Sequence, residues 1–273
     1  MKKGYMETSD HAFIYYEDTE QGDDTILLIP GHMCTTKFYQ RNVVELQKKH
    51  RVVCIDSRGF GNSSKPLQGN SIARHSEDIH EIIEYLQLKK VLLLGWSLSG
   101  SVVVTYAHRY HDENLQGLGL LDCCLFPFSP DDWNSYNLKN YNMDGWNQKY
   151  RLWYADPEQY IDNFCNRVKG TLSEEAAAMV REEIRKTPPW IGFALHSDWC
   201  HQDCTPYLKE LTVPVIIFSG SSLGHKPSMG KYYETLILTY HEHHIYENGG
   251  HMLFWSESES FNAQLEAFLA KIR

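Results

Sequence analysis

A short apolar run that ends at a glycine and passes at once into a helical pattern is the feature that most constrains this chain. Val91–Leu94 is followed by Gly95-Trp-Ser-Leu-Ser-Gly100 and then by Ser-Val-Val-Val-Thr-Tyr-Ala. A strand, tight turn and helix of this kind hold Ser97 in a strained backbone conformation with its hydroxyl above a sheet edge, and they need small residues around the turn. The pattern predicts a nucleophilic Ser97. Ser99 stands where a second glycine is usual, and it is small enough to keep the prediction.

Other short apolar runs indicate more buried strands of a parallel sheet. They are Ile26–Ile29, Val52–Ile55, Leu118–Leu121 and Val213–Phe218, preceded by β-like runs at Tyr5–Glu7 and Ala12–Tyr16. Two helical patterns have apolar faces at Ile79, Ile82, Ile83 and Leu86, and at Phe261, Leu265, Phe268, Leu269 and Ile272. Strands that alternate with helices predict an α/β fold, with a mostly parallel central sheet flanked by helices.

The alternation stops between about Phe126 and Tyr207, where the chain has no strand-like run and is rich in tryptophan and tyrosine. We therefore expect a helical cap inserted at residues 126–205, and a core domain formed by residues 1–125 and 206–273. Most aromatic residues of the cap should form its core, and a few should line the site and favour an apolar substrate group.

Composition argues against several classes of partner. The chain has 26 Lys and Arg against 35 Asp and Glu, a net charge of −9, which does not suit nucleic acid. No run approaches the roughly 20 apolar residues of a membrane helix, and the N-terminus lacks the pattern of a signal peptide. The seven cysteines are odd in number and irregularly spaced, so we expect reduced thiols and a cytoplasmic location.

Two loops resemble those of the α/β-hydrolase fold family, and the resemblance extends over nearly the whole chain. The segment Asp56-Ser-Arg-Gly-Phe-Gly-Asn-Ser63 resembles the family's D-x-R-G-x-G-x-S loop, which has a structural role. Ile29-Pro-Gly-His32 resembles the family's His-Gly oxyanion loop, with Pro30 in the His position. The resemblance implies an oxyanion hole made by the backbone N–H groups of His32 and Leu98.

The C-terminal segment supplies a candidate general base. A pair of glycines precedes His251, just ahead of the last amphipathic helix, and this resembles the loop of the family's catalytic histidine. An imidazole with an ordinary pKa can accept the Ser97 proton near neutral pH. The resemblance implies that His251 is the base.

The acid that should orient His251 has more than one candidate. Most relatives place an Asp after the strand matched by Val213–Phe218, but residues 219–230 contain no carboxylate. Some relatives, haloalkane dehalogenases among them, place the acid at the end of the preceding strand, where this chain has Asp122. The order Ser97, Asp122, His251 fits the family, and the wrong tautomer of an unoriented histidine would be costly. Glu247, another acid or a Ser–His dyad are the alternatives.

A metal site is the alternative interpretation of a group of histidines and cysteines. His196, Cys200, His201 and Cys204 lie within nine residues, and spacings of four could share a helix face. They match an ordinary helix in relatives and lack Cys-x-x-Cys spacing, so we expect no metal and no cofactor. His241-Glu-His-His244 is interpreted as a solvated strand edge.

Together these residues predict a serine hydrolase of carboxylesterase or thioesterase type. It would cleave an ester, thioester or lactone of a small, largely apolar molecule through an acyl-enzyme on Ser97. The Gly95–Leu98 stretch resembles that of pimeloyl-carrier-protein methyl esterases, which implies a carboxylester and leaves an acyl group on a carrier protein open. A serine nucleophile argues against dehalogenase and epoxide hydrolase chemistry, for which the family uses Asp.

Two alternatives are compatible with the same residues. The same residues could serve lyase or perhydrolase chemistry. The absence of an acid from residues 219–230 also fits a ligand-binding protein with a weak triad. No motif in the sequence indicates the natural substrate or the oligomeric state.

Overall fold

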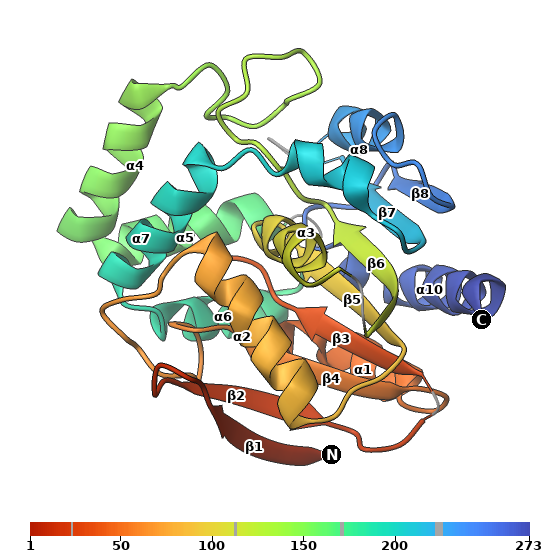
Figure 1. Ribbon diagram of the computed structural model, residues 1–273. Helices are drawn as coiled ribbons and strands as arrows, with labels where there is room; N and C mark the ends of the chain where they lie inside the picture. The colour runs from red at the N-terminus through yellow and green to blue at the C-terminus, as the bar shows by residue number, and fades with distance from the viewer. Residues whose placement is uncertain (23, 112–113, 170–171, 222–225) are drawn as a thin grey trace.

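The computed structural model describes residues 1–22, 24–111, 114–169, 172–221 and 226–273 (Figure 1). At its centre is one eight-stranded sheet with the order β1-β2-β4-β3-β5-β6-β7-β8. The strands are β1 (Lys2–Glu7), β2 (Phe13–Asp18), β3 (Thr25–Ile29), β4 (Arg51–Asp56), β5 (Val91–Trp96), β6 (Leu115–Leu121), β7 (Val215–Gly220) and β8 (His241–Tyr246). Strand β2 is antiparallel to both of its neighbours, and all pairs from β4 to β8 are parallel. The predicted mostly parallel sheet is confirmed.

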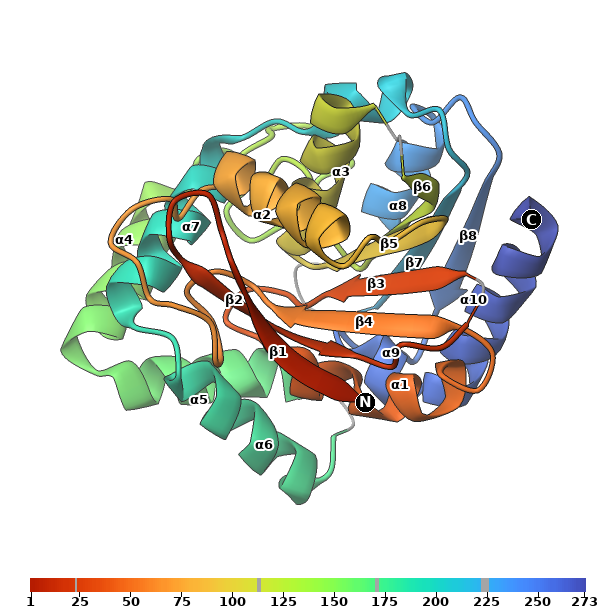
Figure 2. The same ribbon diagram turned by 60° about the horizontal axis from the view of Figure 1, so that its bottom comes forward.

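The apolar runs form strands because helices cover both faces of the sheet. Every residue of β3, β5 and β7 is buried. In Figure 2, helices α2 (Ile72–Tyr85), α3 (Ser99–Tyr110) and α8 (Pro227–Glu234) lie on one side of the sheet. Helices α1 (Gln40–Leu46), α9 (Leu253–Ser256) and α10 (Ser258–Ile272) lie on the other side. Short 3₁₀ turns at Thr36–Tyr39 and Thr205–Glu210 complete the core.

The edge strand β8 departs from the expectation in one respect. The run of histidines does form an edge strand. The His243 side chain, however, is only 3% exposed, and its ring nitrogens lie 2.8 Å from Ser219 Oγ and 2.7 Å from Glu234 Oε2. The expectation of a solvated edge is therefore wrong at His243, because helix α8 packs over this strand.

Four helices follow one another between β6 and β7 and lie beside the sheet (Figures 1 and 2). They are α4 (Met143–Ala155), α5 (Pro157–Lys169), α6 (Glu174–Arg185) and α7 (Pro189–His201). Their buried aromatic residues include Trp146, Tyr150, Trp153, Tyr160 and Trp199. Residues 126 and 205 as domain boundaries stay a prediction. None of the helices in the described part of the chain has the length and hydropathy that a bilayer span requires.

Helix α7 is bonded to the start of α3 and to the segment after β6. The indole N–H of Trp199 donates to Ser101 Oγ and to the Cys124 carbonyl, each at 3.1 Å. Ser101 lies in the first turn of α3, the helix that follows β5, and Cys124 lies three residues after the end of β6. The inserted helices are therefore held over the edge of the sheet where the site residues gather.

The loop after β4 has the structural role that the resemblance implied. Both oxygens of the buried Asp56 carboxylate accept backbone N–H groups, from Thr36 at 2.7 Å and from Asn62 at 2.8 Å. The Arg58 guanidinium is fully buried and donates to both oxygens of Asp78, at 2.8 and 2.7 Å, and to Asp10. A buried cation is tolerated only with such partners, so the loop is locked to α2.

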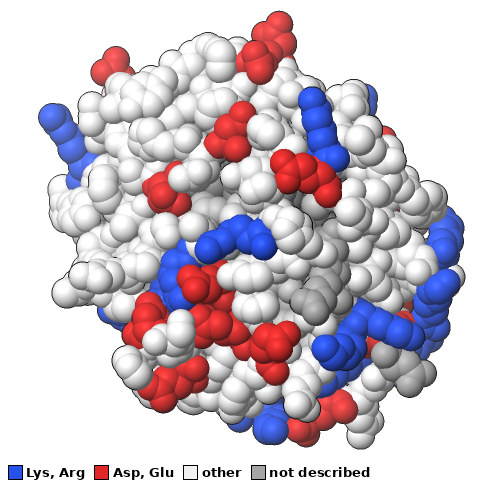
Figure 3. Space-filling view, viewed as in Figure 1, with Lys and Arg blue, Asp and Glu red and all other residues white. Residues whose placement is uncertain are grey.

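Acidic side chains also gather on the surface over α2 and the β1–β2 turn (Figure 3). There Arg74 forms ion pairs with Asp10, Glu77 and Glu81. The Arg58 guanidinium, through its hydrogen bond, keeps the pKa of Asp10 well below its usual range. The buried Arg58–Asp78 ion pair is thus connected to a network of ion pairs on the surface.

Replacing Arg58 with Met should lower the free energy of unfolding by about 3–5 kcal/mol, because Asp78 would keep a buried charge without its main partner. Urea denaturation followed by circular dichroism measures this. The matched control is Arg185→Met, which breaks the ion pair between Arg185 and Glu158 on the surface and should move the midpoint little. Equal effects of the two substitutions would contradict the structural role assigned to Arg58.

Candidate active site

Ser97 lies in the turn between β5 and α3, and its backbone adopts φ +58°. This left-handed conformation is rare and strained for a residue with a side chain. The turn is so tight that a Cβ atom on Gly95 would lie 2.2 Å from the backbone oxygen of Ser99. The Ser97 N–H donates to the Leu121 carbonyl at 2.9 Å, which fixes the turn to the end of β6.

The contacts of Ser99 explain why a serine stands where glycine is usual. Its hydroxyl donates to the Pro30 carbonyl at 2.6 Å and so ties the turn to the loop after β3. In that loop, a Cβ atom on Gly31 would lie 3.1 Å from Ser97 Cβ, so the backbone passes directly against the serine. The structure thus places His32 and Leu98 in the two segments that border Ser97. Their role as an oxyanion hole stays a prediction.

Ser97, His251 and Asp122 are hydrogen-bonded in series. The His251 Nε2 atom is 3.0 Å from Ser97 Oγ, and Nδ1 is 2.6 Å from Asp122 Oδ2. The side chains of His251 and Asp122 are 11% and 2% exposed, so little water competes for these bonds. The three residues come from turns after β5, β6 and β8, because parallel strands bring their carboxyl ends to one edge.

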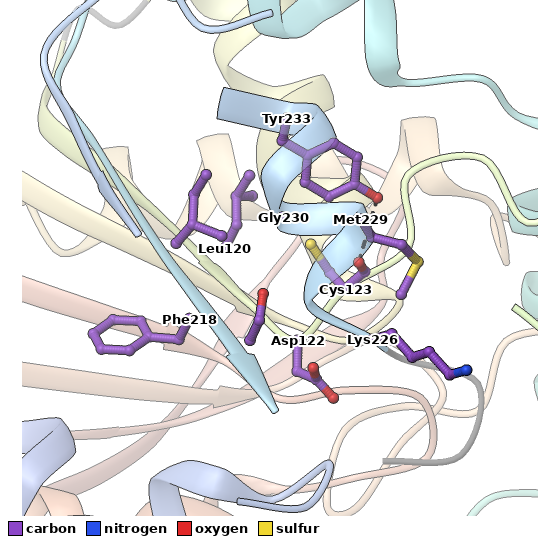
Figure 4. A pocket seen from close by; sticks show the side chains of 10 residues that line it. Leu120, Asp122, Cys123, Phe218, Lys226, Met229, Gly230 and Tyr233 are labelled. Atoms are coloured by element: carbon purple, nitrogen blue, oxygen red, sulfur yellow. Dashed lines mark hydrogen bonds between the residues drawn. The ribbon is translucent and has the colours of Figure 1, made fainter. Parts of the chain in front are cut away.

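Asp122 is hydrogen-bonded to strand β7 at two points. Its backbone N–H donates to the Phe218 carbonyl at 2.7 Å, and its Oδ1 accepts the Gly220 N–H at 2.9 Å. Its φ of +42° turns the chain sharply as it leaves β6. Figure 4 shows the Asp122 carboxylate turned away from Tyr233 and Met229, beside a cavity of about 10 Å³. Such a cavity has room for about one water molecule.

The other candidates for the acid lie in different surroundings. Glu247 is exposed after the end of β8. Of residues 219–230, in which the sequence has no carboxylate, residues 222–225 lie outside the described residues. Among the acids considered, Asp122 is the one the structure places on His251 Nδ1.

Two residues that the motifs did not single out position the histidine. The Trp96 indole N–H donates to the His251 carbonyl at 2.8 Å. At the end of β7, a Cβ atom on Gly220 would lie 2.6 Å from the Gly250 carbonyl oxygen, so the histidine loop passes against this glycine. In the sequence Trp96 is only the variable residue of G-x-S, and no local signal marks its partner 155 positions away.

A second Ser–His–acid arrangement is present, and its geometry is different. Ser219, His243 and Glu234 are hydrogen-bonded in series. Ser219 belongs to strand β7 itself rather than to a tight turn, and a Cβ atom on Gly230 would lie 2.6 Å from Ser219 Oγ. Helix α8 therefore covers this hydroxyl, which leaves no room for a substrate carbonyl.

The residues weighed as metal ligands have other contacts. In the described ranges no group of three or more His, Cys, Asp and Glu side chains could hold a metal ion. His196 hydrogen-bonds to Tyr150, and Cys204 lies 3.7 Å from Thr105 Oγ1. Burial raises the pKa of the Cys200 thiol to about 12 and that of Cys204 to about 11, so both thiols are neutral near pH 7. All seven cysteines are buried and free of disulfides.

Comparisons with known proteins agree with the fold. A curated relative, the AB hydrolase superfamily protein YisY of Bacillus subtilis, is 24% identical over 97% of this chain and 98% of its own length. The structure is similar to an esterase from Exiguobacterium antarcticum, at 19% identity and TM-score 0.90, with 98% of this chain and 100% of that chain covered. It is also similar to a bromoperoxidase from Bacillus anthracis, at 21% identity, the same TM-score of 0.90 and the same coverage.

A family model provides the assignment. The model described as alpha/beta hydrolase fold matches residues 24–258, which include the turn at Ser97, Asp122 and His251. This supports the expectation of a hydrolase enzyme. The chain belongs to the α/β-hydrolase fold family.

Proposed function

We propose that this protein is a serine hydrolase that cleaves a carboxylic ester, thioester or lactone of a small molecule. The observation that carries the proposal is the hydrogen-bonded series from Ser97 Oγ through the His251 ring to Asp122, with the serine on a strained turn. This arrangement suits nucleophilic catalysis, because the base is within reach of the nucleophile and the acid fixes the tautomer of the base. The esterase with the same fold agrees with it.

The reaction follows from the protonation states. The Asp122 carboxylate accepts a hydrogen bond from His251 Nδ1–H, which keeps the ring proton on Nδ1, so Nε2 is left as the acceptor for the Ser97 proton. Ser97 Oγ bonds to the substrate carbonyl carbon, and His251 then gives the proton to the leaving alcohol or thiol as that bond breaks. A water molecule, deprotonated by His251, attacks the acyl-enzyme, and the carboxylic acid leaves with Ser97 restored.

The oxyanion formed in both steps needs donors that are already in place. Backbone N–H groups of His32 and Leu98 are proposed for this role. The close approach of Gly31 to Ser97 and the start of α3 at Ser99 support it, because the first N–H groups of a helix have no partner within the helix.

Replacing Ser97 with Ala should reduce kcat for p-nitrophenyl esters at least about 10³-fold, because the acyl-enzyme cannot form. A fluorophosphonate probe should label the wild-type chain at Ser97 and leave the variant unlabelled, as intact-mass spectrometry would show. Labelling at another serine, or wild-type turnover retained by the variant, would exclude this mechanism. A product assay with hydrogen peroxide as acceptor separates hydrolysis from perhydrolase chemistry.

Replacing Asp122 with Asn should reduce kcat about 10³- to 10⁴-fold, because an amide favours the wrong tautomer of His251. The matched control is Glu247→Gln, which removes a charge from the exposed acid near the same histidine and should leave kcat within about twofold. Steady-state kinetics of both variants decides the assignment. A large loss on Glu247→Gln with little loss on Asp122→Asn would reverse it.

Replacing Ser99 with Ala should lower kcat about tenfold with little change in KM, because a hydrogen bond of about 1 kcal/mol no longer fixes the loop that carries the oxyanion donor. Steady-state kinetics with one neutral ester measures the change in kcat and the change in KM separately. A change confined to KM would place Ser99 in ground-state binding instead.

A further inference from the structure

A buried carboxylate joins the inserted helices to the loop after β3. Glu183 lies on α6, and its side chain is only 1% exposed. Its Oε2 atom accepts a hydrogen bond from the Thr35 hydroxyl at 2.9 Å, and its Oε1 atom lies 2.6 Å from the Lys37 ammonium. Lys186, just after the same helix, donates to both oxygens, at 2.8 and 2.9 Å. Glu183 thus connects α6 to two residues of the core.

The Glu183 carboxylate is charged at neutral pH. Burial opposes the charge, but the hydrogen bonds from Lys186, Lys37 and Thr35 outweigh burial and lower the pKa of Glu183 from its ordinary value. Hydrogen bonds to an ionised acceptor are roughly twice as strong as those between neutral groups. The side chains of both lysines are partly exposed, whereas Thr35 is buried. Water can therefore replace a lost partner at either ammonium, but not at the Thr35 hydroxyl.

Thr35 directly follows the turn that carries the proposed oxyanion donor. The Cys34 N–H donates to the Gly31 carbonyl at 3.0 Å, and the residue before Cys34, Met33, has φ +61°. Residues 31–34 therefore form one tight turn, with His32 inside it. Because the turn is closed by its own backbone, a shift of Thr35 moves the whole turn, including the His32 N–H.

The turn is anchored on both sides by side chains. Before the turn, the Ser99 hydroxyl donates to the loop backbone at 2.6 Å. After the turn, Asp56 accepts the Thr36 N–H at 2.7 Å, and Glu183 accepts the hydroxyl of Thr35. Ser99 and Asp56 belong to the core, whereas Glu183 belongs to an inserted helix. The position of α6 is therefore transmitted to the turn through one buried hydrogen bond.

We propose that Glu183 is a positioning residue for the Ser97 reaction, and that through Thr35 it holds the His32 N–H where the oxyanion forms. The proposal rests on the proposed function, because it concerns the same oxyanion donor. A donor of this kind must lie about 3 Å from the developing charge, and loss of one donor costs roughly 10²- to 10³-fold in kcat. A small displacement of the turn forfeits part of that factor. The inserted helix α6 thus contributes to the rate of the chemical step.

The first test removes the Thr35 hydroxyl and leaves the Glu183 carboxylate with both ammonium partners. Thr35→Val should lower kcat for a neutral ester about tenfold and leave KM within about twofold, as steady-state kinetics would show. The matched control is Thr187→Val, two residues after α6, because the buried Thr187 hydroxyl has no hydrogen-bond partner among the described residues. This control should leave kcat unchanged. An unchanged kcat in Thr35→Val, or an equal fall in Thr187→Val, would overturn the inference.

The second test removes the charge of Glu183 and keeps the size of its side chain. Glu183→Gln should lower kcat about tenfold, because the remaining amide is a weaker acceptor for Thr35. The matched control is Glu182→Gln, since the Glu182 side chain is 66% exposed and lies 3.8 Å from Lys37. It should leave kcat within about twofold. The double variant Thr35→Val/Glu183→Gln should lose less than the product of the two single losses, because both act on one hydrogen bond. A loss equal to that product would contradict the inference.

A transition-state analogue distinguishes positioning of the oxyanion donor from a general loss of stability. When a trifluoromethyl ketone binds, Ser97 Oγ bonds to its carbonyl carbon, the Ser97 proton passes to His251, and the carbonyl oxygen becomes an oxyanion. The Ki of this inhibitor should rise about tenfold in Thr35→Val and in Glu183→Gln. The Kd of the intact ester for Ser97→Ala should change less than about twofold when Thr35→Val is added.

The same measurements separate this inference from the proposed function. A lower melting temperature with an unchanged Ki in both variants would give Glu183 a structural role alone and overturn the inference. If the wild-type enzyme cleaves esters and is labelled at Ser97, that result ends this inference and leaves the proposed function standing. Absence of both ester turnover and Ser97 labelling from the wild type would end the proposed function and this inference with it.

Discussion

The close approach of backbone to backbone at the end of β5 is the constraint on which the site depends. Gly95 lies so near the Ser99 carbonyl that a side chain there would overlap it, and this proximity lets Ser97 adopt its left-handed conformation. The strain is tolerated because the turn is bonded to β6 through Ser97 N–H and to the loop after β3 through Ser99. A relaxed turn would lose the alignment of Ser97 with His251.

The same sheet edge also supplies the other half of the hydrogen-bonded series. Asp122 leaves β6 in a second left-handed turn and is anchored by the backbone of β7, both by Phe218 and by Gly220. Gly220 in turn lets the histidine loop pass close by. The end of β7 therefore fixes both the acid and the segment that carries the base. Asp122 occupies the position of the acid although no carboxylate follows β7 in residues 219–230.

The inserted helices, by contrast, are attached to the core by side-chain contacts. Helix α7 is bonded through Trp199 to Ser101 in the first turn of α3 and to the Cys124 carbonyl after β6. Helix α7 also carries His196, which is hydrogen-bonded to Lys149 and Tyr150, so α4 is joined to the same anchor. In our proposed function the core provides the residues that carry out the chemistry.

The sequence by itself determined the mostly parallel sheet, the core helices α2, α3 and α10, and the strained turn, because apolar runs, helical periodicity and small residues around a serine are local patterns. It also indicated Asp122 and His251 as partners of Ser97, although their hydrogen bonds join residues 129 and 154 positions apart. Only the tertiary structure decided which acid lies on the histidine, that Ser99 bonds to Pro30, that Trp96 holds the His251 loop, and that His243 is buried. These contacts depend on side chains from distant strands meeting at one edge, and no spacing along the chain encodes such a meeting.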